Sequence, residues 1–236
     1  MSFKHKKQIL LSILIPIFNE EKTLKKLLKK INSINISKEV IVINDGSIDN
    51  TLNILNDNKI LFNHMVSYKN NKGKGFACRQ GISIAKGKYT IIQDADLEYN
   101  PDNYTNLLKE INNKHKVIYG SRVLKGGKIN SPSGIRPYLS KFANFILTKI
   151  SNLFNNQNLT DAHTCYKLFE TEIIQNIELK ENGFAFCPEI TAKISKLGIK
   201  IKEVPIDYNG RSYSEGKKIK FYHALEAIIS LIKYNF

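Results

Sequence analysis

The feature that most constrains the fold of this chain is a repeated alternation between short apolar runs and amphipathic, lysine-bearing segments. Residues 9–17 are almost continuously apolar, and residues 38–44 contain an uninterrupted apolar run at 40–43. Both patterns are typical of strands buried on both faces. Between them, residues 24–31 place leucines and an isoleucine at helical spacing opposite lysines. Alternation at this spacing predicts right-handed βαβ units, and therefore an α/β fold with a mainly parallel sheet flanked by helices.

The same pattern continues along the chain, with a change of character after about residue 120. Further strands are predicted near 65–68, from Tyr89 and over 117–120, and a half-exposed strand over 199–208. Helices are predicted from Asn50 onward, up to Ala85, and over 102–113, 137–154, 188–197 and 221–233. The sequence contains no internal repeat and no long linker, so we expect a single domain.

Polar side chains follow four of the predicted strands at the point where each strand ends. The carboxyl ends of parallel strands meet at one edge of a sheet, where ligands bind in open α/β folds. These strand ends therefore predict one composite site. Its residues are Asn19 and Glu20, Asp45, Lys72 and Lys74, and Asp94 and Asp96.

The most acidic of these strand ends is the stretch from Asp94 to Glu98. On an extended strand alternate side chains share one side, so Asp94, Asp96 and Glu98 are expected to converge. Crowded carboxylates repel unless a cation lies between them, and hard oxygen ligands favour Mg²⁺ or Mn²⁺. The alternative is a solvated acidic turn that caps a helix at Asp102.

The net charge of +15 leaves three classes of partner open: nucleic acid, an anionic membrane surface and phosphorylated substrates. The lysines are scattered and no nucleic-acid-binding signature is present, so a solvated basic surface is expected for most of them. Two basic clusters remain candidates for membrane contact. They are Lys4, Lys6 and Lys7, and Lys217, Lys218 and Lys220.

Cysteine usage and hydropathy bear on the cellular compartment. Three cysteines without metal-ligand spacing fit a reducing cytosol and make a zinc site unexpected. No apolar run reaches the roughly 18 residues of a membrane-spanning helix, and the N-terminal residues lack a signal-peptide cleavage pattern. We therefore expect neither a transmembrane helix nor a signal peptide.

The glycines around Lys74 raise the possibility of a known phosphate-binding loop. The P-loop spacing is absent, however, and Cys78 stands where a dinucleotide-binding fingerprint has its third glycine. A tight turn before a helix is the favoured interpretation. Lys72 or Lys74 remains a candidate contact for an anionic ligand.

Taken together, four segments resemble the motifs of family 2 glycosyltransferases in order and spacing. They are residues 16–21 (PIFNEE), 44–51 (NDGSIDNT), 71–75 (NKGKG) and 94–98 (DADLE). The resemblance covers about residues 11–218 and is closest to the polyprenyl-phosphate (dolichyl-phosphate) hexosyltransferases. Two departures stand out. Asn44 precedes Asp45 where the family usually has two aspartates. Many relatives add C-terminal transmembrane helices, whereas none is expected in this sequence.

The resemblance implies a GT-A fold in one domain over residues 1–236, with a nucleotide-sugar-binding half at about 9–121 and an acceptor-binding half at about 122–236. The implied donor is a nucleotide-diphosphate sugar of the GDP-mannose or UDP-glucose type. The implied metal is Mg²⁺ or Mn²⁺, held by Asp96 with Asp94 and Glu98. Asp45 is implied to bind the base or ribose. Other implied donor-site residues are Pro16, Phe18, Glu20, Lys74, Arg211 and Lys217.

For the acceptor, the resemblance implies a polyprenyl phosphate bound by Arg122 and Arg136, with Arg211 also available. Asp161 is implied to lie near the acceptor, where it orients that group or acts as a base; a helix cap is the alternative. We expect His163 to be structural. Glu189 is either a supporting residue of the site or an acid at a helix start.

A lipid acceptor implies a peripheral enzyme at the cytoplasmic face of a membrane, with a partner protein as one means of recruitment. The helix over 137–154 and the last helix carry apolar faces that suit a membrane surface, although ordinary core packing also explains them. One alternative function is the same donor chemistry with a glycan or protein hydroxyl. Others are nucleic-acid binding, or an inactive sugar-nucleotide-binding module, which the two aspartates Asp94 and Asp96 argue against.

Overall fold

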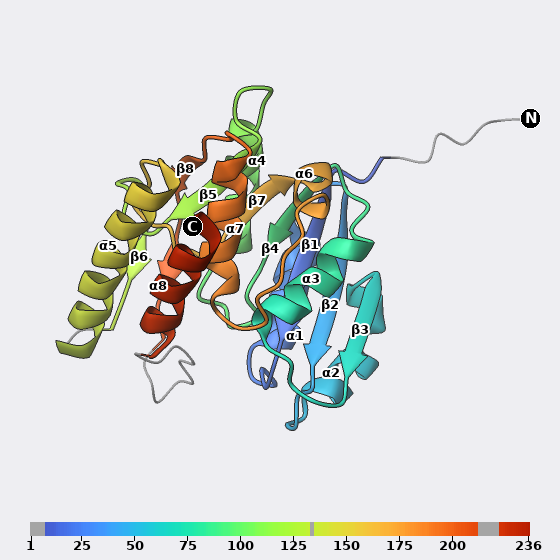
Figure 1. The fold of residues 1–236 in the computed structure, drawn as a ribbon. Coiled ribbons are helices and arrows are strands. Elements are labelled where there is room, and N and C mark those ends of the chain that lie inside the picture. Colours follow the sequence, from blue (N-terminus) through green and yellow to red (C-terminus); the bar gives the residue numbers. More distant parts are fainter. Residues whose placement is uncertain (1–7, 133–134, 212–221) are drawn as a thin grey trace, which may run out of the picture.

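The computed structural model describes residues 8–132, 135–211 and 222–236. Its centre is a seven-stranded sheet in the order β3-β2-β1-β4-β7-β5-β8 (Figure 1). The strands of this sheet are β1 (Leu11–Ile17), β2 (Lys38–Asp45), β3 (His64–Tyr68), β4 (Tyr89–Ile92), β5 (Val117–Ser121), β7 (Lys167–Glu170) and β8 (Lys202–Pro205). Two short strands, β6 (Ile129–Asn130) and β9 (Tyr208–Asn209), pair separately.

Most of the pairings in the large sheet are parallel. Strand β1 pairs in parallel with β2 and β4, β2 pairs in parallel with β3, and β5 pairs in parallel with β8. The exception is β7, which lies antiparallel between β4 and β5. The predicted α/β fold with a mainly parallel sheet is therefore confirmed. The central antiparallel strand was not predicted from the sequence.

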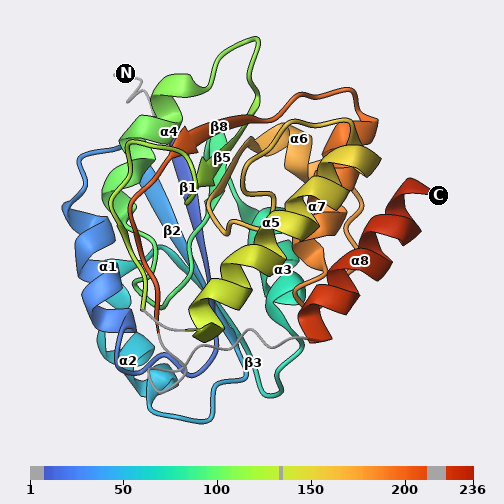
Figure 2. The ribbon, with the colours of Figure 1, turned by 90° about the vertical axis from the view of Figure 1, so that its left-hand side faces the viewer.

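Helices cover both faces of this sheet. One face packs against α1 (Leu24–Ser33), α2 (Thr51–Asp57) and α4 (Tyr104–Glu110), and the other against α3 (Lys74–Ile84), α6 (Thr171–Gln175) and α7 (Phe186–Lys196). Short 3₁₀ turns lie between α2 and β3, at Lys59–Leu61, and between β4 and α4, at Pro101–Asn103. Two helices, α5 (Ile135–Asn155) and α8 (Tyr222–Asn235), form an outer layer over α7 at the end of the molecule away from β3 (Figures 1 and 2).

The burial of β1 explains why its sequence is apolar at almost every position. Ile13 and Ile15 belong to the core beneath α1, whereas Leu14 points into the core beneath α3. Both faces of the strand are therefore buried, as its apolar run predicts. In residues 8–132, 135–211 and 222–236, no helix has the length and apolar character needed to cross a lipid bilayer.

Candidate functional site

The loops that follow β1 and β2 are joined to each other by hydrogen bonds. Asn19 adopts a left-handed backbone conformation with φ of 52°, which turns the chain sharply at the end of β1. Its side chain accepts a hydrogen bond from the amide of Ile48 at 2.9 Å, and its own amide donates to Ser47 Oγ at 3.0 Å. The amide of the buried Glu20 donates to Thr51 Oγ1 at 2.9 Å. These contacts hold Glu20 at the strand edge.

Asp45, the last residue of β2, fastens the start of α3 to the sheet. Its carboxylate accepts hydrogen bonds from the amides of Lys72 at 2.9 Å and Gly73 at 2.7 Å. Gly73 has φ of 104° and precedes the helix directly, so the predicted tight turn is confirmed. Each carboxylate oxygen has two acceptor positions, so Asp45 retains capacity for a ligand hydroxyl or ring nitrogen.

The acidic stretch departs from the predicted geometry. Strand β4 ends at Ile92, and the residues that follow form a turn in which Leu97 has φ of 62°. The expected convergence of Asp94, Asp96 and Glu98 by strand alternation is therefore wrong. The turn nevertheless keeps Asp94 and Glu98 close enough to Asp96 for their charges to raise the pKa of Asp96.

Each of these acids faces a basic or hydroxyl group. Lys74 Nζ lies 2.5 Å from Asp94 Oδ1 and 3.1 Å from Cys165 Sγ. Arg211 Nη2 lies 2.7 Å from Asp96 Oδ2, and Arg211 Nη1 lies 3.3 Å from Glu20 Oε2. Glu98 accepts hydrogen bonds from the Arg211 amide at 2.8 Å and the Tyr208 hydroxyl at 2.7 Å. Arg211 thus links the end of β1 to the acidic turn.

The chemistry of the acidic turn fits a divalent cation. Burial and the neighbouring charges of Asp94 and Glu98 raise the pKa of Asp96 to about 7, a crowding of negative charge that a bound cation relieves. Among the described residues, no three His, Cys, Asp or Glu side chains form a complete set of metal ligands. Mg²⁺ sites commonly consist of one or two carboxylates completed by substrate phosphates. Asp94 and Asp96 suit that kind of site.

A second charged group lies in the other half of the molecule. The carboxylate of the fully buried Asp161 accepts hydrogen bonds from Arg122 Nε at 2.7 Å and Nη2 at 2.8 Å, and from the Arg122 amide at 3.1 Å. Burial alone would raise the pKa of Asp161, but the Arg122 guanidinium lowers it to about 2. Asp161 is therefore ionised at neutral pH and is a weak base. Arg122 also lies over the Tyr208 ring, 5.2 Å from its centroid.

Three residues that the sequence did not single out support this pair. Asn144 of α5 donates a hydrogen bond to Asp161 Oδ1 at 3.1 Å. Glu203 of β8 accepts from the amides of Thr160 at 2.6 Å and Asp161 at 2.9 Å. Tyr208 contacts both Arg122 and Glu98. The only sequence signal for Asn144 is a polar residue within an apolar helical pattern.

Lys167 is a buried lysine close to Asp161. Lys167 of β7 donates a hydrogen bond to the Ala162 carbonyl at 2.9 Å, and its ammonium lies 3.6 Å from the Tyr119 ring centroid. Burial lowers the pKa of Lys167 to about 8. Burial and the charge of Lys167 lower the pKa of His163 to about 4, so His163 is neutral at pH 7.

The remaining candidate residues fall into three groups. Pro16 lies within β1 opposite Ile43, and Phe18 follows that strand directly. Glu189 lies in the first turn of α7, where it accepts hydrogen bonds from the amides of residues 180 and 181 and pairs with Lys193; it supports that loop. The side chain of Arg136 and the whole of Lys217 lie outside the described residues.

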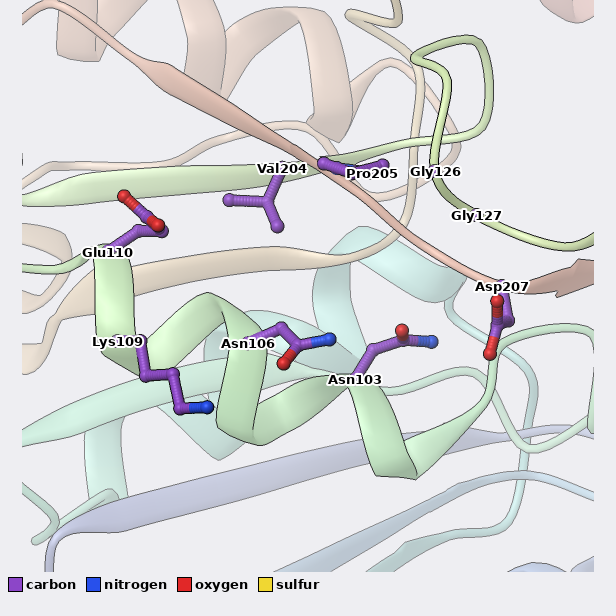
Figure 3. A pocket seen from close by; sticks show the side chains of 9 residues that line it. All are labelled: Asn103, Asn106, Lys109, Glu110, Gly126, Gly127, Val204, Pro205 and Asp207. Atoms are coloured by element: carbon purple, nitrogen blue, oxygen red, sulfur yellow. The ribbon is translucent and has the colours of Figure 1, made fainter.

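A surface pocket of about 440 Å³ lies apart from these groups, between α4 and the segments around β8 (Figure 3). None of the candidate donor or acceptor residues lines this pocket. The pocket is therefore separate from the candidate residues described above. Its lining residues are Asn103, Asn106, Lys109, Glu110, Gly126, Gly127, Val204, Pro205 and Asp207.

Comparison with known proteins gives a consistent family. Residues 12–178 match the family described as glycosyl transferase family 2. A dolichyl-phosphate beta-glucosyltransferase of Trichomonas vaginalis is 28% identical over an alignment of 246 positions, which covers 95% of this chain and 72% of that protein. The dolichol-phosphate mannosyltransferase of Pyrococcus furiosus is 28% identical over 209 residues, which cover 87% of this chain and 58% of that protein.

Solved structures show the same fold at lower sequence identity. The glucosyl-3-phosphoglycerate synthase of Mycobacterium tuberculosis, in complex with Mg²⁺ and uridine diphosphate, superposes with a TM-score of 0.70 at 15% identity. The match covers 96% of this chain and 79% of that one. The same enzyme with Mn²⁺, uridine diphosphate and glucosyl-3-phosphoglycerate gives a TM-score of 0.68.

Proposed function

This chain belongs to glycosyltransferase family 2 and is a glycosyltransferase, and from that premise we propose that it transfers a hexose from a nucleotide-diphosphate sugar to a polyprenyl phosphate. The names of two relatives, a dolichyl-phosphate glucosyltransferase and a dolichol-phosphate mannosyltransferase, support this acceptor class. They leave two donors open, of the UDP-glucose type and the GDP-mannose type.

In this proposal the donor lies along the strand ends from β1 to β4. Asp45 binds the base or ribose, next to Pro16, Phe18 and Glu20. Asp96 and Asp94 hold Mg²⁺ or Mn²⁺. When bound, this ion would neutralise the negative charge on the leaving diphosphate. The two cations already at these acids, Lys74 and Arg211, are placed to bind phosphate oxygens.

The observation that carries the choice of acceptor is the Arg122–Asp161 pair. A sugar or protein hydroxyl needs a general base to remove its proton, and a carboxylate with a pKa of about 2 that is already bound by a guanidinium is poorly suited to that role. A lipid phosphate is already ionised and needs a cation instead. Arg122, fixed by Asp161, provides one. Arg136 is proposed to add positive charge at the acceptor phosphate, and Lys217 at the donor diphosphate.

The proposed step is a direct displacement with inversion. An oxygen of the acceptor phosphate attacks the anomeric carbon and forms the new glycosyl phosphate bond. The bond from that carbon to the donor diphosphate breaks, and the nucleoside diphosphate leaves with the electron pair. Arg122 orients the attacking phosphate, while Lys74 and Arg211 stabilise the charge that develops on the leaving group.

We also propose that the enzyme acts peripherally at the cytoplasmic face of a membrane, where it meets its lipid acceptor. The free thiols of Cys78, Cys165 and Cys187 are consistent with a reducing compartment. A membrane partner protein is a further candidate for recruitment.

The test is transfer of labelled sugar from a panel of nucleotide sugars to polyprenyl phosphate in the presence of Mn²⁺ or Mg²⁺. We expect a lipid-linked sugar with one donor, and loss of product when the metal is chelated. Arg122→Lys keeps the charge but loses the bidentate contact to Asp161, so transfer should fall at least about tenfold. Transfer to a glycan hydroxyl, with none to lipid phosphate for any donor, would replace this proposal with the hydroxyl-acceptor alternative.

A further inference from the structure

Helix α5 exposes an apolar face to solvent, with Lys149 as the one charged residue within it. Six large apolar side chains on it are between 41% and 80% exposed, and their spacing of three, four or seven residues places them along one side of the helix. They are Tyr138, Leu139, Phe142, Phe145, Ile146 and Leu153.

Helix α8 packs beside α5 and carries exposed apolar residues of its own. The two helices pack together (Figure 2). The Phe154 and Phe236 rings meet edge to face at 5.6 Å between centroids. Exposed apolar residues of α8 lie on the same outer layer. They are Leu225, Ile229 and Ile232, and the exposed Phe236 follows the helix directly. We call these residues, together with the six of α5, the α5–α8 apolar face.

The charges around this face indicate what covers it. The 21 residues of α5 include no Asp or Glu, and α8 has a single acid, Glu226. Lys141 and Lys149 are exposed on α5, and Lys149 Nζ lies 5.5 Å from the Phe145 ring centroid. A second copy of a chain with a net charge of +15 would bring like charges together at this face. An anionic lipid surface instead offers an apolar layer bordered by negative head groups.

The inner side of α5 contacts the segment that carries Asp161. Asn144 donates to Asp161 Oδ1 at 3.1 Å, and the buried Thr148 accepts a hydrogen bond from the Ala162 amide at 3.3 Å. The two sides of one helix therefore join the exposed apolar face to the Arg122–Asp161 pair. No loop intervenes between them.

We propose that α5 lies flat on an anionic membrane through the α5–α8 apolar face, and that Asn144 and Thr148 thereby hold the Arg122–Asp161 pair at the level of the lipid head groups. Asn144 acts as a positioning residue through Asp161. The docking itself stands on the exposed face and its charges. The link to the acceptor rests on the proposed function.

The docking is tested by co-sedimentation of the full chain with vesicles, without donor or metal. The vesicles consist of phosphatidylcholine alone or mixed with phosphatidylglycerol. We expect binding to the anionic vesicles, and a loss of affinity of at least about tenfold in the double variant Phe142→Ser with Phe145→Ser. The matched control is Leu197→Ser at the end of α7, since Leu197 is 59% exposed and Phe142 is 55% exposed.

Three results would overturn the docking. The first is that the double variant binds the vesicles as tightly as the wild type. The second is that Leu197→Ser loses as much affinity as the double variant. The third is that the wild type forms a dimer in solution and the double variant does not. Replacing Lys141 and Lys149 together by Ala should weaken binding to the anionic vesicles several-fold and leave binding to phosphatidylcholine alone as it was.

The link to Asp161 is tested by comparing transfer to a long polyprenyl phosphate in vesicles with transfer to a short, water-soluble isoprenyl phosphate. In the double phenylalanine variant the ratio of the two rates should fall at least about tenfold. Asn144→Leu should lower both rates and keep the wild-type ratio, with vesicle binding intact. An unchanged ratio in the double variant removes the link. If the wild type transfers to neither acceptor while vesicle binding persists, the proposed function fails and the docking stands.

Discussion

At the scale of single residues, this molecule keeps charged groups in places where burial opposes them. Asp161 is fully buried and is stabilised by a bidentate arginine. Lys167 is fully buried as well, yet in the described part of the chain its ammonium has a carbonyl and an aromatic ring as neighbours and forms no ion pair. A buried ammonium without a carboxylate opposes folding.

The burial of Lys167 predicts a pH dependence of stability. The pKa of Lys167 is about 8 in the folded chain against a usual value of 10.5, so between these pH values the unfolded chain binds more protons. The free energy of unfolding should therefore rise with pH over this window, by at most about 3 kcal/mol. Urea unfolding of the wild type and of Lys167→Met at pH 7 to 10 measures it.

The comparison isolates Lys167, because tyrosines and cysteines that titrate in the same range are common to both proteins. The wild type should gain stability relative to Lys167→Met as the pH rises. A constant difference between the two proteins across this range would show that Lys167 is not buried as a cation.

At the scale of secondary-structure elements, the start of α3 depends on a close approach between backbones. A Cβ on Gly75 would lie 2.4 Å from the Glu181 carbonyl oxygen and 2.7 Å from Phe186 Cβ. Gly75→Ala should therefore lower the free energy of unfolding by about 1 to 3 kcal/mol, although alanine is the better helix former. Gly183→Ala is the matched control, because a Cβ there meets no described heavy atom within 4 Å.

Urea unfolding of both variants checks this prediction. Gly183→Ala should stay within about 0.5 kcal/mol of the wild type. If Gly75→Ala is as stable as its control, the 181–186 segment is free to move away and does not fix the start of α3.

The elements that the sequence predicted are those whose own pattern determines their burial. The apolar runs of β1 and β2 and the amphipathic helices α1, α5 and α7 all appear near their expected bounds. Strand β7 was missed because it has four residues and begins with Lys167; its pairing with β4 and β5 is decided by residues far away in the chain. The strand expected over 199–208 is divided into β8 and β9.

The candidate site also has features that the sequence predicted and features that it did not. Parallel topology was enough to bring Glu20, Asp45 and the acidic turn to one edge of the sheet. The ion pairs could not be predicted from the sequence, because their partners are far apart in the chain. Arg122 and Asp161 are separated by 39 residues, and Lys74 and Asp94 by 20. The geometry of the acidic turn was also missed. A leucine in the left-handed region, as at residue 97, has no reliable signal in the sequence.

At the scale of the whole molecule, β7 joins the two halves of the chain. Leu168 pairs with Ile91 of β4 on one side and with Ile118 of β5 on the other. The strand comes from the second half of the sequence yet completes the sheet of the first. Without β7, the strands β3, β2, β1 and β4 would be separated from β5 and β8. The chain should therefore unfold in one cooperative transition.

The absence of tryptophan from the sequence allows each half to be followed separately. Phe62→Trp reports on the first half, where Phe62 packs against the core beneath α1, and Phe154→Trp reports on the contact between α5 and α8. The two single-tryptophan variants should show the same urea midpoint by fluorescence, each coinciding with its own far-ultraviolet circular dichroism. A lower midpoint for the Phe154→Trp fluorescence alone would mean that the outer helices melt before the sheet. The helix that carries Asn144 would then be able to move independently of the strand ends that bind the donor.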